Sequence, residues 1–383
     1  MDADRRAHIR VQCLRWIDRR SLLFASCAVA LAGRCSALAS HAQALYAAAR
    51  RGPDGGHSAA IFTAEGRDVR AVALPGRGHD LTVCPATRRC VVFARRPGNF
   101  AVVFSIDRSA EPIAFTTPPD RHFYGHGVFS HDGRFLYATE NDFDAGRGVI
   151  GIYVANEKFR RIGEFPSHGV GPHDLALLHS ASVLVVANGG LREHPDFGDG
   201  RRVLNPDAVE TSIAYIDLRN GDLIERHELG PARRLSLRHM DVGEGDTVII
   251  GAQVQGPATA GSDLVFRHRR EQELMALQLP EPVTSRLSGY ISSVAIDSSG
   301  GIAAVTSAPG ASAVMIDITS GRVLRTVALA DVAGVAPSPG RGEFLLTSGT
   351  GALGQASASG GIVGEAAASP WAWDNHATEL PER

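Results

Sequence analysis

The sequence predicts an all-β fold, a seven-bladed β-propeller, and three observations indicate it. A short phrase recurs in which Gly or Pro precedes His and an alternating apolar run follows; its histidines His79, His126 and His173 are equally spaced, 47 residues apart. A repeat of roughly 40–50 residues is the size of a propeller blade. The 42 glycines and 20 prolines suit many short strands joined by tight turns. Finally, the two ends of the chain carry complementary parts of one blade.

Each blade is expected to hold four antiparallel strands, the first of which begins at the His phrase. The first blade is predicted at residues 79–84, 90–95, 100–106 and 112–116. The second begins at His126, turns at an Asp-Gly pair, and continues through residues 135–139, 149–154 and 159–164. The third begins at His173 and continues through residues 183–187, 212–218 and 223–229.

The third blade also contains a long excursion from Asn188 to Glu210, which exceeds what a hairpin needs and is a candidate functional loop. The fourth blade begins at Arg238-His239, with residues 247–250 next. The fifth is predicted at residues 290–294, 302–306, 313–318 and 323–329, and the sixth at residues 332–335 and 344–347. Residues 350–369 are rich in Gly, Ala and Ser and give a poor strand signal.

The C-terminal residues 373–380 are predicted to form the first strand of a seventh blade, but the other three strands of that blade do not follow them. Residues 45–49, 59–63 and 69–74 can supply the other three strands. A blade made of one C-terminal strand and three N-terminal strands closes the ring and leaves no open sheet edge. We therefore expect one propeller domain over residues 43–383.

Residues 1–42 are predicted to be a twin-arginine signal peptide. Arg19 and Arg20 precede the apolar residues 22–32, and small residues then offer cleavage after Ala39 or Ala42. The apolar stretch is too short to span a bilayer, so the mature chain is expected to be periplasmic and without a transmembrane segment. A net charge of −2 excludes an electrostatic footprint for nucleic acid.

Two cysteines remain in the mature chain, Cys84 and Cys90, on either side of a predicted turn. In an oxidising compartment a disulfide between them is possible. The alternative is two free buried thiols.

The first strands of the blades line the central channel of a propeller, so their starts meet at one end of the ring. Five histidines are expected there as metal ligands: His79, His126, His173, His239 and His376. Converging neutral imidazoles suit Cu, Fe, Ni or Zn, and neighbouring carboxylates favour iron over copper(I). Iron or copper is therefore the predicted ion. In the fifth and sixth blades Ser293 and Val335 replace the histidine.

Further residues are expected near the histidines, as ligands or hydrogen-bond partners: Asp80, Arg95, Arg96, Arg121, His122, Glu140, Asn141, Asp174, Asn188, Gln253 and Asp374. The aspartates are candidates to accept a hydrogen bond from a ligating imidazole. Arg95, Arg96 and Arg121 form a candidate clamp for an anion. The acidic segment 140–144 is expected to be a solvated turn from which Glu140 is able to reach the channel.

The alternative interpretation of this pattern is structural. Propellers use a His or Asp near this corner to tie backbone amides of neighbouring blades, and Asp80 and Asp174 fit that role. The sequence carries no Gly-x-Ser-x-Gly motif, no Gly-rich phosphate loop and no His-Glu-x-x-His zinc helix, so no catalytic residue is assigned.

Several whole phrases carry a family resemblance: Gly76–Asp80, Val92–Gly98, His122–Gly127, Ala138–Asp142, Gly146–Gly151, Gly171–Ala176 and Trp373–His376. They resemble a bacterial family of unknown function, domain-of-unknown-function family 1513 (DUF1513), from about Ala44 to the end of the chain. The resemblance implies an exported YVTN-like propeller. It also implies periplasmic imelysin-like or iron-uptake proteins as partners, and hence a role in acquiring iron or another metal. The chain departs from the family over residues 350–369.

The expected function is the binding of a metal ion, or of a metal-bearing partner, at the histidine mouth of a non-catalytic propeller. One alternative is a propeller enzyme, a lactonase or a metal-dependent oxidase, that uses the same mouth. Another is an interaction platform that docks a partner on the loop from Asn188 to Glu210.

Overall fold

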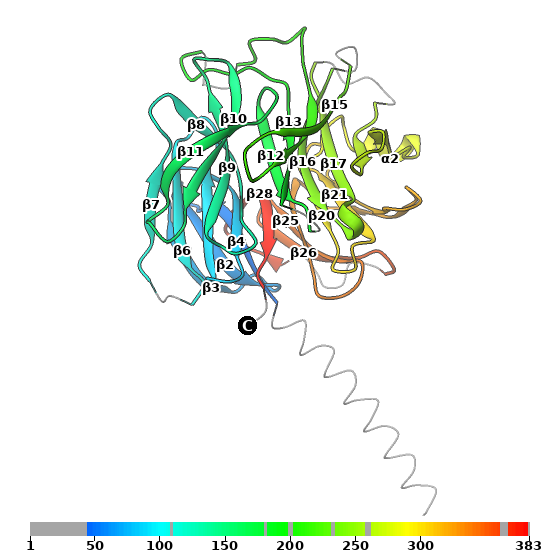
Figure 1. The fold of residues 1–383 in the computed structure, drawn as a ribbon. Coiled ribbons are helices and arrows are strands. Elements are labelled where there is room, and N and C mark those ends of the chain that lie inside the picture. Colours follow the sequence, from blue (N-terminus) through cyan, green and yellow to red (C-terminus); the bar gives the residue numbers. More distant parts are fainter. Residues whose placement is uncertain are drawn as a thin grey trace, which may run out of the picture. The chain divides into compact units, whose positions relative to one another are not determined.

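Seven four-stranded antiparallel sheets make up the protein, which confirms the predicted seven-bladed propeller (Figure 1). The computed structural model describes residues 44–107, 110–179, 182–197, 202–230, 234–256, 262–360 and 367–381. The predicted leader, residues 1–42, lies outside these described residues. Within them, no helix combines the length and the apolar character needed to cross a membrane.

Six blades are built from strands that follow one another in the chain. The first holds β4 (Gly78–Cys84), β5 (Arg89–Ala94), β6 (Phe100–Ser105) and β7 (Ile113–Thr116). The second holds β8 (Arg121–Phe129), β9 (Phe135–Asp142), β10 (Arg147–Val154) and β11 (Arg160–Pro166). The third holds β12 (Pro172–Leu177), β13 (Val183–Asn188), β14 (Ser212–Asp217) and β15 (Leu223–Glu228).

The fourth blade holds β16 (Leu235–Val242), β17 (Val248–Val254), β18 (Val265–His268) and β19 (Met275–Ala276). The fifth holds β20 (Ser293–Ile296), β21 (Ile302–Ser307), β22 (Ser312–Asp317) and β23 (Val323–Ala328). The short helix α2 (Glu281–Arg286) precedes it, and the 3₁₀ turn η2 (Glu244–Asp246) lies within the fourth blade. The sixth holds β24 (Val332–Pro337), β25 (Glu343–Ser348), β26 (Ala352–Ser357) and β27 (Ala367–Ala368).

The seventh blade closes the ring as predicted. Its innermost strand is the C-terminal β28 (Ala372–Glu379), which pairs with β1 (Leu45–Arg51); β2 (His57–Thr63) and β3 (Asp68–Ala73) follow outward. Arg50 strengthens this junction, since its guanidinium lies 2.6 Å from Asp68 and 3.8 Å from the ring centroid of Trp371. Both ends of the described chain are thereby held in one sheet.

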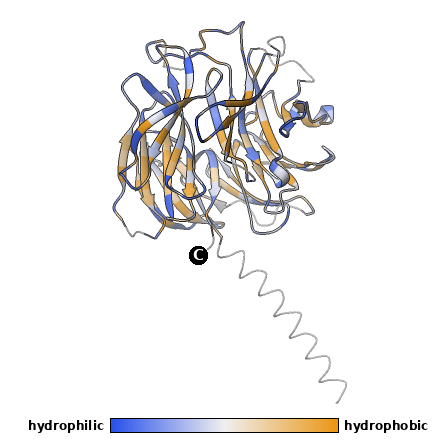
Figure 2. Ribbon diagram, viewed as in Figure 1, coloured by the Kyte–Doolittle hydropathy of each residue, from blue (hydrophilic) through white to orange (hydrophobic). Residues whose placement is uncertain are grey.

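Apolar packing between the blades holds the ring together. The seven innermost strands contact one another in a closed cycle, with β28 against both β24 and β4. Figure 2 shows apolar residues concentrated in the strands and hydrophilic ones in the connections. Middle strands such as β13 and β21 are buried along their whole length, because each is covered by a neighbouring blade on both faces.

The sixth blade is more regular than its composition indicates. Residues 350–369 were expected to give poor strands, yet β26 pairs with β25 over five residues, from Glu343↔Ser357 to Thr347↔Leu353. Leu353 and Ala356 are buried in the core, so packing against neighbouring blades supplies the stability that the small side chains do not.

Cys84 and Cys90 are free and buried, so the possible disulfide is not formed. In the ladder Cys90 lies opposite Val83, one residue before Cys84. Consecutive residues of a strand point to opposite faces, and the two thiols accordingly belong to different core clusters. The second alternative, two free buried thiols, is the one the structure holds.

The hydrogen-bond ladder is interrupted in the innermost strand of five blades at the position of the predicted histidine. The register shifts lie between Gly78 and Leu81 in β4, Phe123 and Gly127 in β8, Pro172 and Asp174 in β12, Leu237 and Met240 in β16, and opposite Ala48–Arg50 in β28. Such bulges bend a strand and redirect a side chain.

Gly127 provides a test of how tightly this region is packed. A Cβ on Gly127 would lie 2.3 Å from Cζ of Phe93, whereas a Cβ on Gly163, also in a strand, would have nothing within 4 Å. Gly127→Ala is expected to lower the free energy of unfolding by about 1–3 kcal/mol through overpacking. Gly163→Ala, the matched control, is expected to change it by less than about 1 kcal/mol. Urea denaturation measures both, and equal effects would contradict the packing described.

Candidate functional site

All five predicted histidines meet in the channel. They come from five blades, on β4, β8, β12, β16 and β28, and every one is buried. The closest ring centroids, those of His239 and His376, are 4.5 Å apart, and the most distant of the measured pairs, His79 and His239, are 6.3 Å apart. The sequence-derived topology therefore places these side chains correctly.

The ladder interruptions, together with Gly125, explain how imidazoles come so close. Gly125 has a φ of +108°, and a Cβ there would lie 2.4 Å from Cδ2 of His79. Only glycine combines this backbone conformation with this approach. His126, the next residue, thereby reaches a ring-centroid distance of 4.9 Å from His79.

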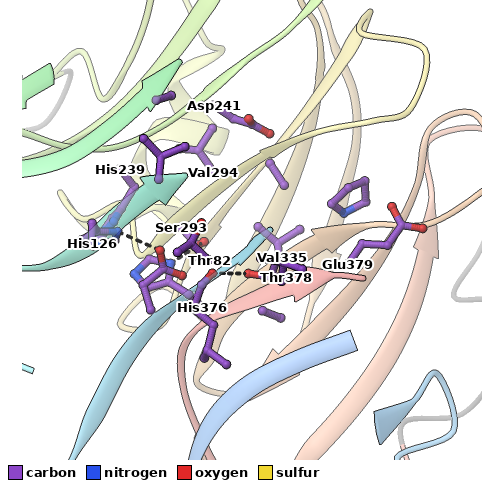
Figure 3. A pocket seen from close by; sticks show the side chains of 18 of the residues that line it. Thr82, His126, His239, Asp241, Ser293, Val294, Val335, His376, Thr378 and Glu379 are labelled. Atoms are coloured by element: carbon purple, nitrogen blue, oxygen red, sulfur yellow. Dashed lines mark hydrogen bonds and ion pairs between the residues drawn. The ribbon is translucent and has the colours of Figure 1, made fainter. Parts of the chain in front are cut away.

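The histidine cluster separates two cavities of the channel. One has a volume of about 700 Å³ and is lined at the cluster by His126, His239 and His376 (Figure 3). The other has a volume of about 420 Å³ and is lined by His79, His173 and again His239. The five imidazoles thus form a layer across the channel, and His239 faces both sides.

His126 is oriented as a metal ligand would be. Its Nδ1 donates to Asp80 Oδ2 over 3.1 Å and lies 3.3 Å from Asp174 Oδ1. A carboxylate only accepts, so the proton lies on Nδ1 and the lone pair on Nε2. That Nε2 is buried and has no hydrogen-bond partner among the described residues.

Two further imidazoles resemble His126 in this respect, and a third, His173, also has a buried Nε2 without a partner among the described residues. Nδ1 of His376 lies 3.0 Å from the hydroxyl of Ser293, which is able to accept, and Nε2 of His376 is buried. In His239 it is Nδ1 that is buried, and neither of these two nitrogens has a hydrogen-bond partner in the part of the chain that the structure describes. The candidate ligand atoms of His126, His239 and His376 all lie within 4.8 Å of one another.

His79 and His173 are held differently, by arginines. Nη1 of Arg95 lies 3.3 Å from Nδ1 of His79, and Nη1 of Arg238 lies 3.1 Å from Nδ1 of His173. A guanidinium only donates, so these Nδ1 atoms accept and the ring protons lie on Nε2. In this tautomer Nε2 offers no lone pair to a metal. The group His79, His126 and His173 also falls within 4.8 Å, yet two of its members are tied in this way.

Burial lowers the pKa of all five imidazoles. The pKa of His376 falls to about 3 through burial, although Asp80 opposes the effect. The pKa values of His79, His173 and His239 fall well below 6.5, first through burial and then through neighbouring histidines and arginines. The pKa of His126 is also lowered, although Asp174 opposes the effect. At neutral pH the layer is therefore uncharged, which is the form of imidazole that binds metals.

The predicted structural role is present for Asp174, whereas Asp80 contacts the His126 ring and, among the described residues, no backbone amide of a neighbouring blade donates to it. Asp174 Oδ2 accepts from the amide of Met240 in the next blade over 2.9 Å, and Asp241 Oδ2 accepts from the amide of Ile296 over 2.7 Å. Burial raises the pKa of both carboxyls to about 6. Asp241 escaped the sequence analysis because it follows His239 by two residues, whereas Asp80 and Asp174 directly follow theirs.

Arg95 and Arg96 reach the smaller cavity, and Arg121 does not. Arg121 lies opposite Asp142 in the ladder, and its guanidinium is 2.6 Å from Asp120 and 3.1 Å from Asp142. The predicted three-arginine clamp is therefore wrong in this member. Arg238 lines the smaller cavity where Arg121 was expected. The sequence signal for Arg238 was its position directly before His239.

Glu140 does not reach the channel either. The sequence predicted a loop from residue 140, but β9 continues to Asp142, so Glu140 lies within a sheet. It is fully buried, and its carboxylate accepts from Arg161 over 2.8 Å and from the hydroxyl of Tyr153. Burial raises its pKa.

The remaining predicted residues divide between the cavity and its supports. Gln253 lines the smaller cavity, and Asp374 lies behind it, 3.3 Å from Arg95. His122 and Asn141 bond to each other, 3.0 Å apart, outside the cavity, and Asn141 donates to the carbonyl of Glu193 over 3.0 Å. Asn188 is buried and donates to the carbonyl of Ser167.

The long excursion of the third blade forms one wall of the smaller cavity. Its contribution consists of Leu191, Glu193, Arg202 and Val203. The carboxylate of Glu193 lies 3.0 Å from Arg96, which fixes this wall to the first blade. The excursion therefore belongs to the candidate site.

Solved structures similar to this chain show the same fold at low identity. Kuenenia stuttgartiensis hydrazine synthase matches with a TM-score of 0.59 and 14% identity, over 78% of this chain and 91% of that one. A chain of the mitotic checkpoint complex matches with a TM-score of 0.57 and 16% identity, over 79% and 82%. The β-propeller domain of Myceliophteria thermophila Cps50 (Swd1) matches with a TM-score of 0.55 and 11% identity, over 79% and 92%.

At these identities the likeness shows the fold alone. No curated protein matches the sequence. The family model described as "Protein of unknown function (DUF1513)" matches residues 72–380, which include every histidine of the cluster. The chain belongs to the DUF1513 family.

Proposed function

We propose that the protein is an exported, non-catalytic propeller that binds a transition metal ion at His126, His239 and His376. Four buried ring nitrogens of the cluster have no hydrogen-bond partner among the described residues, His126 Nε2, His173 Nε2, His239 Nδ1 and His376 Nε2. The proposal rests on the three that no arginine-bound ring carries, those of His126, His239 and His376, because Arg238 fixes the proton of His173 on Nε2. Leaving such atoms unsatisfied costs free energy. A single metal ion that accepts the lone pairs of all three nitrogens removes the free-energy cost of leaving them unsatisfied.

The ligand set favours a borderline first-row ion. Imidazole suits iron, copper, nickel and zinc, and this set contains no thiolate. Asp80 and Asp174 act on Nδ1 of His126 and so increase the basicity of the ligand. Iron and copper remain the proposed ions, and copper(II) is expected to bind more tightly than iron(II) in vitro.

The proposed place of action is the periplasm, and the proposed role is metal acquisition with imelysin-like or iron-uptake partners. The Arg19-Arg20 pair and the apolar residues 22–32 support export. The resemblance described above supports the role in acquisition.

A metal-dependent enzyme is the second candidate, and one observation favours it. Three imidazoles leave a coordination position open, as catalytic metal sites do, and the larger cavity lies directly beside them. A lactone or an oxidisable metal ion has room there.

Metal analysis of the purified exported protein tests the first proposal. The wild type is expected to hold about one ion per chain, and the double variant His126→Ala/His376→Ala is expected to lose it because two of three ligands are removed. His179→Ala, an exposed histidine elsewhere, is the matched control and retains the ion. Equal and negligible metal in the wild type and the double variant would contradict the proposal.

A second group, Glu225, His227 and His268, provides an internal comparison. Both nitrogens of His268 are already bonded there, to the Tyr215 hydroxyl at 2.6 Å and the Gln272 carbonyl at 2.9 Å. His227→Ala is therefore expected to leave the metal content unchanged. Loss of the ion in this variant would move the site to that group.

Asp80→Asn tests the carboxylate behind His126. Removing its charge is expected to weaken metal affinity by about 10-fold or more, because the partner of Nδ1 sets the basicity of the ligand. Asp241→Asn is the matched control, since Asp241 accepts hydrogen bonds from the backbone amides of Val242 and Ile296 and so connects two blades. Competitive titration measures both, and equal affinities would show that the charge of Asp80 does not act on the ion.

Turnover assays separate the two candidates. The metal-loaded protein is expected to hydrolyse no lactone, and to oxidise ferrous or cuprous ions no faster than the double variant His126→Ala/His376→Ala. Turnover that depends on His126 would establish the enzyme instead.

A further inference from the structure

The smaller cavity carries an excess of positive charge. Four arginines line it, Arg95, Arg96, Arg202 and Arg238, and Glu193 is the one carboxylate among its described lining residues. Asp374 lies behind Arg95, and Glu193 pairs with Arg96. Two negative charges thus face four positive ones.

Arg238 is the buried arginine of this set that lacks an ion pair among the described residues. It is 5% exposed, and it forms no ion pair among the described residues; Nη1 donates to neutral His173, and Nε is buried without a partner. Burial and the charge of Arg96 lower its pKa to about 10. Glu193 opposes this lowering, but its carboxylate is paired with Arg96 and makes no ion pair with Arg238 among the described residues. A buried charge without an ion-pair partner is costly, so this position is suited to an anion from outside the chain.

The donors form two groups across the cavity. Nη1 atoms of Arg96 and Arg238 both approach Nδ1 of His173, at 3.4 and 3.1 Å, so their guanidiniums lie together. Arg95 lies at His79, whose ring centroid is 5.9 Å from that of His173. The hydroxyl of Tyr124, 2% exposed and unpartnered, adds a neutral donor.

We propose that this cavity binds a small dicarboxylate or tricarboxylate, with one carboxylate on Arg96 and Arg238 and another on Arg95. Guanidinium forks bind carboxylates with paired hydrogen bonds. Two separated poles match two carboxylates on one short carbon chain better than one compact tetrahedral anion. A volume of about 420 Å³ accommodates such a molecule. This site does not depend on the proposed metal, since the donors are arginines on the other side of the histidine layer.

Isothermal titration of the purified protein at constant ionic strength tests the proposal, with citrate, succinate, inorganic phosphate and acetate as probes. Each is titrated with and without prior chelator treatment. Citrate or succinate is expected to bind at least about 10-fold more tightly than phosphate or acetate, because only they engage both poles. Binding is expected to survive chelation, which separates this site from the metal site.

Arg238→Gln is expected to weaken binding of the dicarboxylate or tricarboxylate by at least about 10-fold, and Arg238→Lys by less, since lysine keeps the charge but not the fork. Arg219→Gln, on an arginine exposed at the surface, is the matched control and leaves affinity unchanged. Circular dichroism checks the fold of each variant. Absence of binding to the wild type, phosphate binding as tight as that of citrate, or equal affinity in Arg238→Gln and Arg219→Gln would overturn the proposal.

Discussion

The interrupted ladder of the innermost strands is the constraint on which the channel depends. In a regular strand the side chains alternate between the two faces of the sheet, so half of them would point into the core of a blade. The register shifts at His79, His126, His173, His239 and His376 release between one and three residues of each strand from that alternation, and the histidine is among them in every case. The fifth blade, whose β20 pairs without a shift, presents Ser293 in place of an imidazole. The sixth blade has a shift in β24 between Val332 and Gly334 but carries Val335 instead of a histidine, so the shift alone does not supply an imidazole.

The polar groups beside the imidazoles of the channel differ in whether they accept or donate a hydrogen bond. Carboxylates accept the hydrogen bond of His126 Nδ1 and the bonds from backbone amides that connect neighbouring blades. Guanidiniums instead donate to Nδ1 of His79 and of His173. Because a carboxylate fixes a ring proton on the near nitrogen and a guanidinium fixes it on the far one, the same residue type has two chemical roles. One layer of five imidazoles thus presents lone pairs toward one set of neighbours and N–H groups toward another.

The sequence analysis succeeded where a local pattern and a global rule coincide. Alternating apolar runs gave the strands of the first blade within two residues, and the propeller topology then brought the five histidines together. The second strand pair of the sixth blade was missed because β26 is stabilised by its neighbours and its own residues are small. The bound metal ion and the bound dicarboxylate or tricarboxylate remain proposals.

Errors at the site have a common physical source, which is uncertainty of one or two residues in where strands end. Glu140 was placed in a loop because acidic residues are rare in strands, but Tyr153 and Arg161 satisfy its carboxylate inside the sheet. Arg238 precedes its histidine where the first three units have Gly or Pro, and Asp241 follows that histidine by two residues instead of one, so a fixed spacing from the histidine did not reveal them. Sequence spacing identifies which strand a residue occupies more readily than which way it points.

The pairing of β28 with β1 has a consequence for biosynthesis. The strands β1, β2 and β3 of the seventh blade are synthesised before the other six blades, whereas their innermost partner β28 is synthesised after them. Until then the edge of β1 stays unpaired, and exposed edges are prone to intermolecular pairing. The ring therefore cannot close before β28 has been synthesised, and the five imidazoles come together only after that strand has paired with β1.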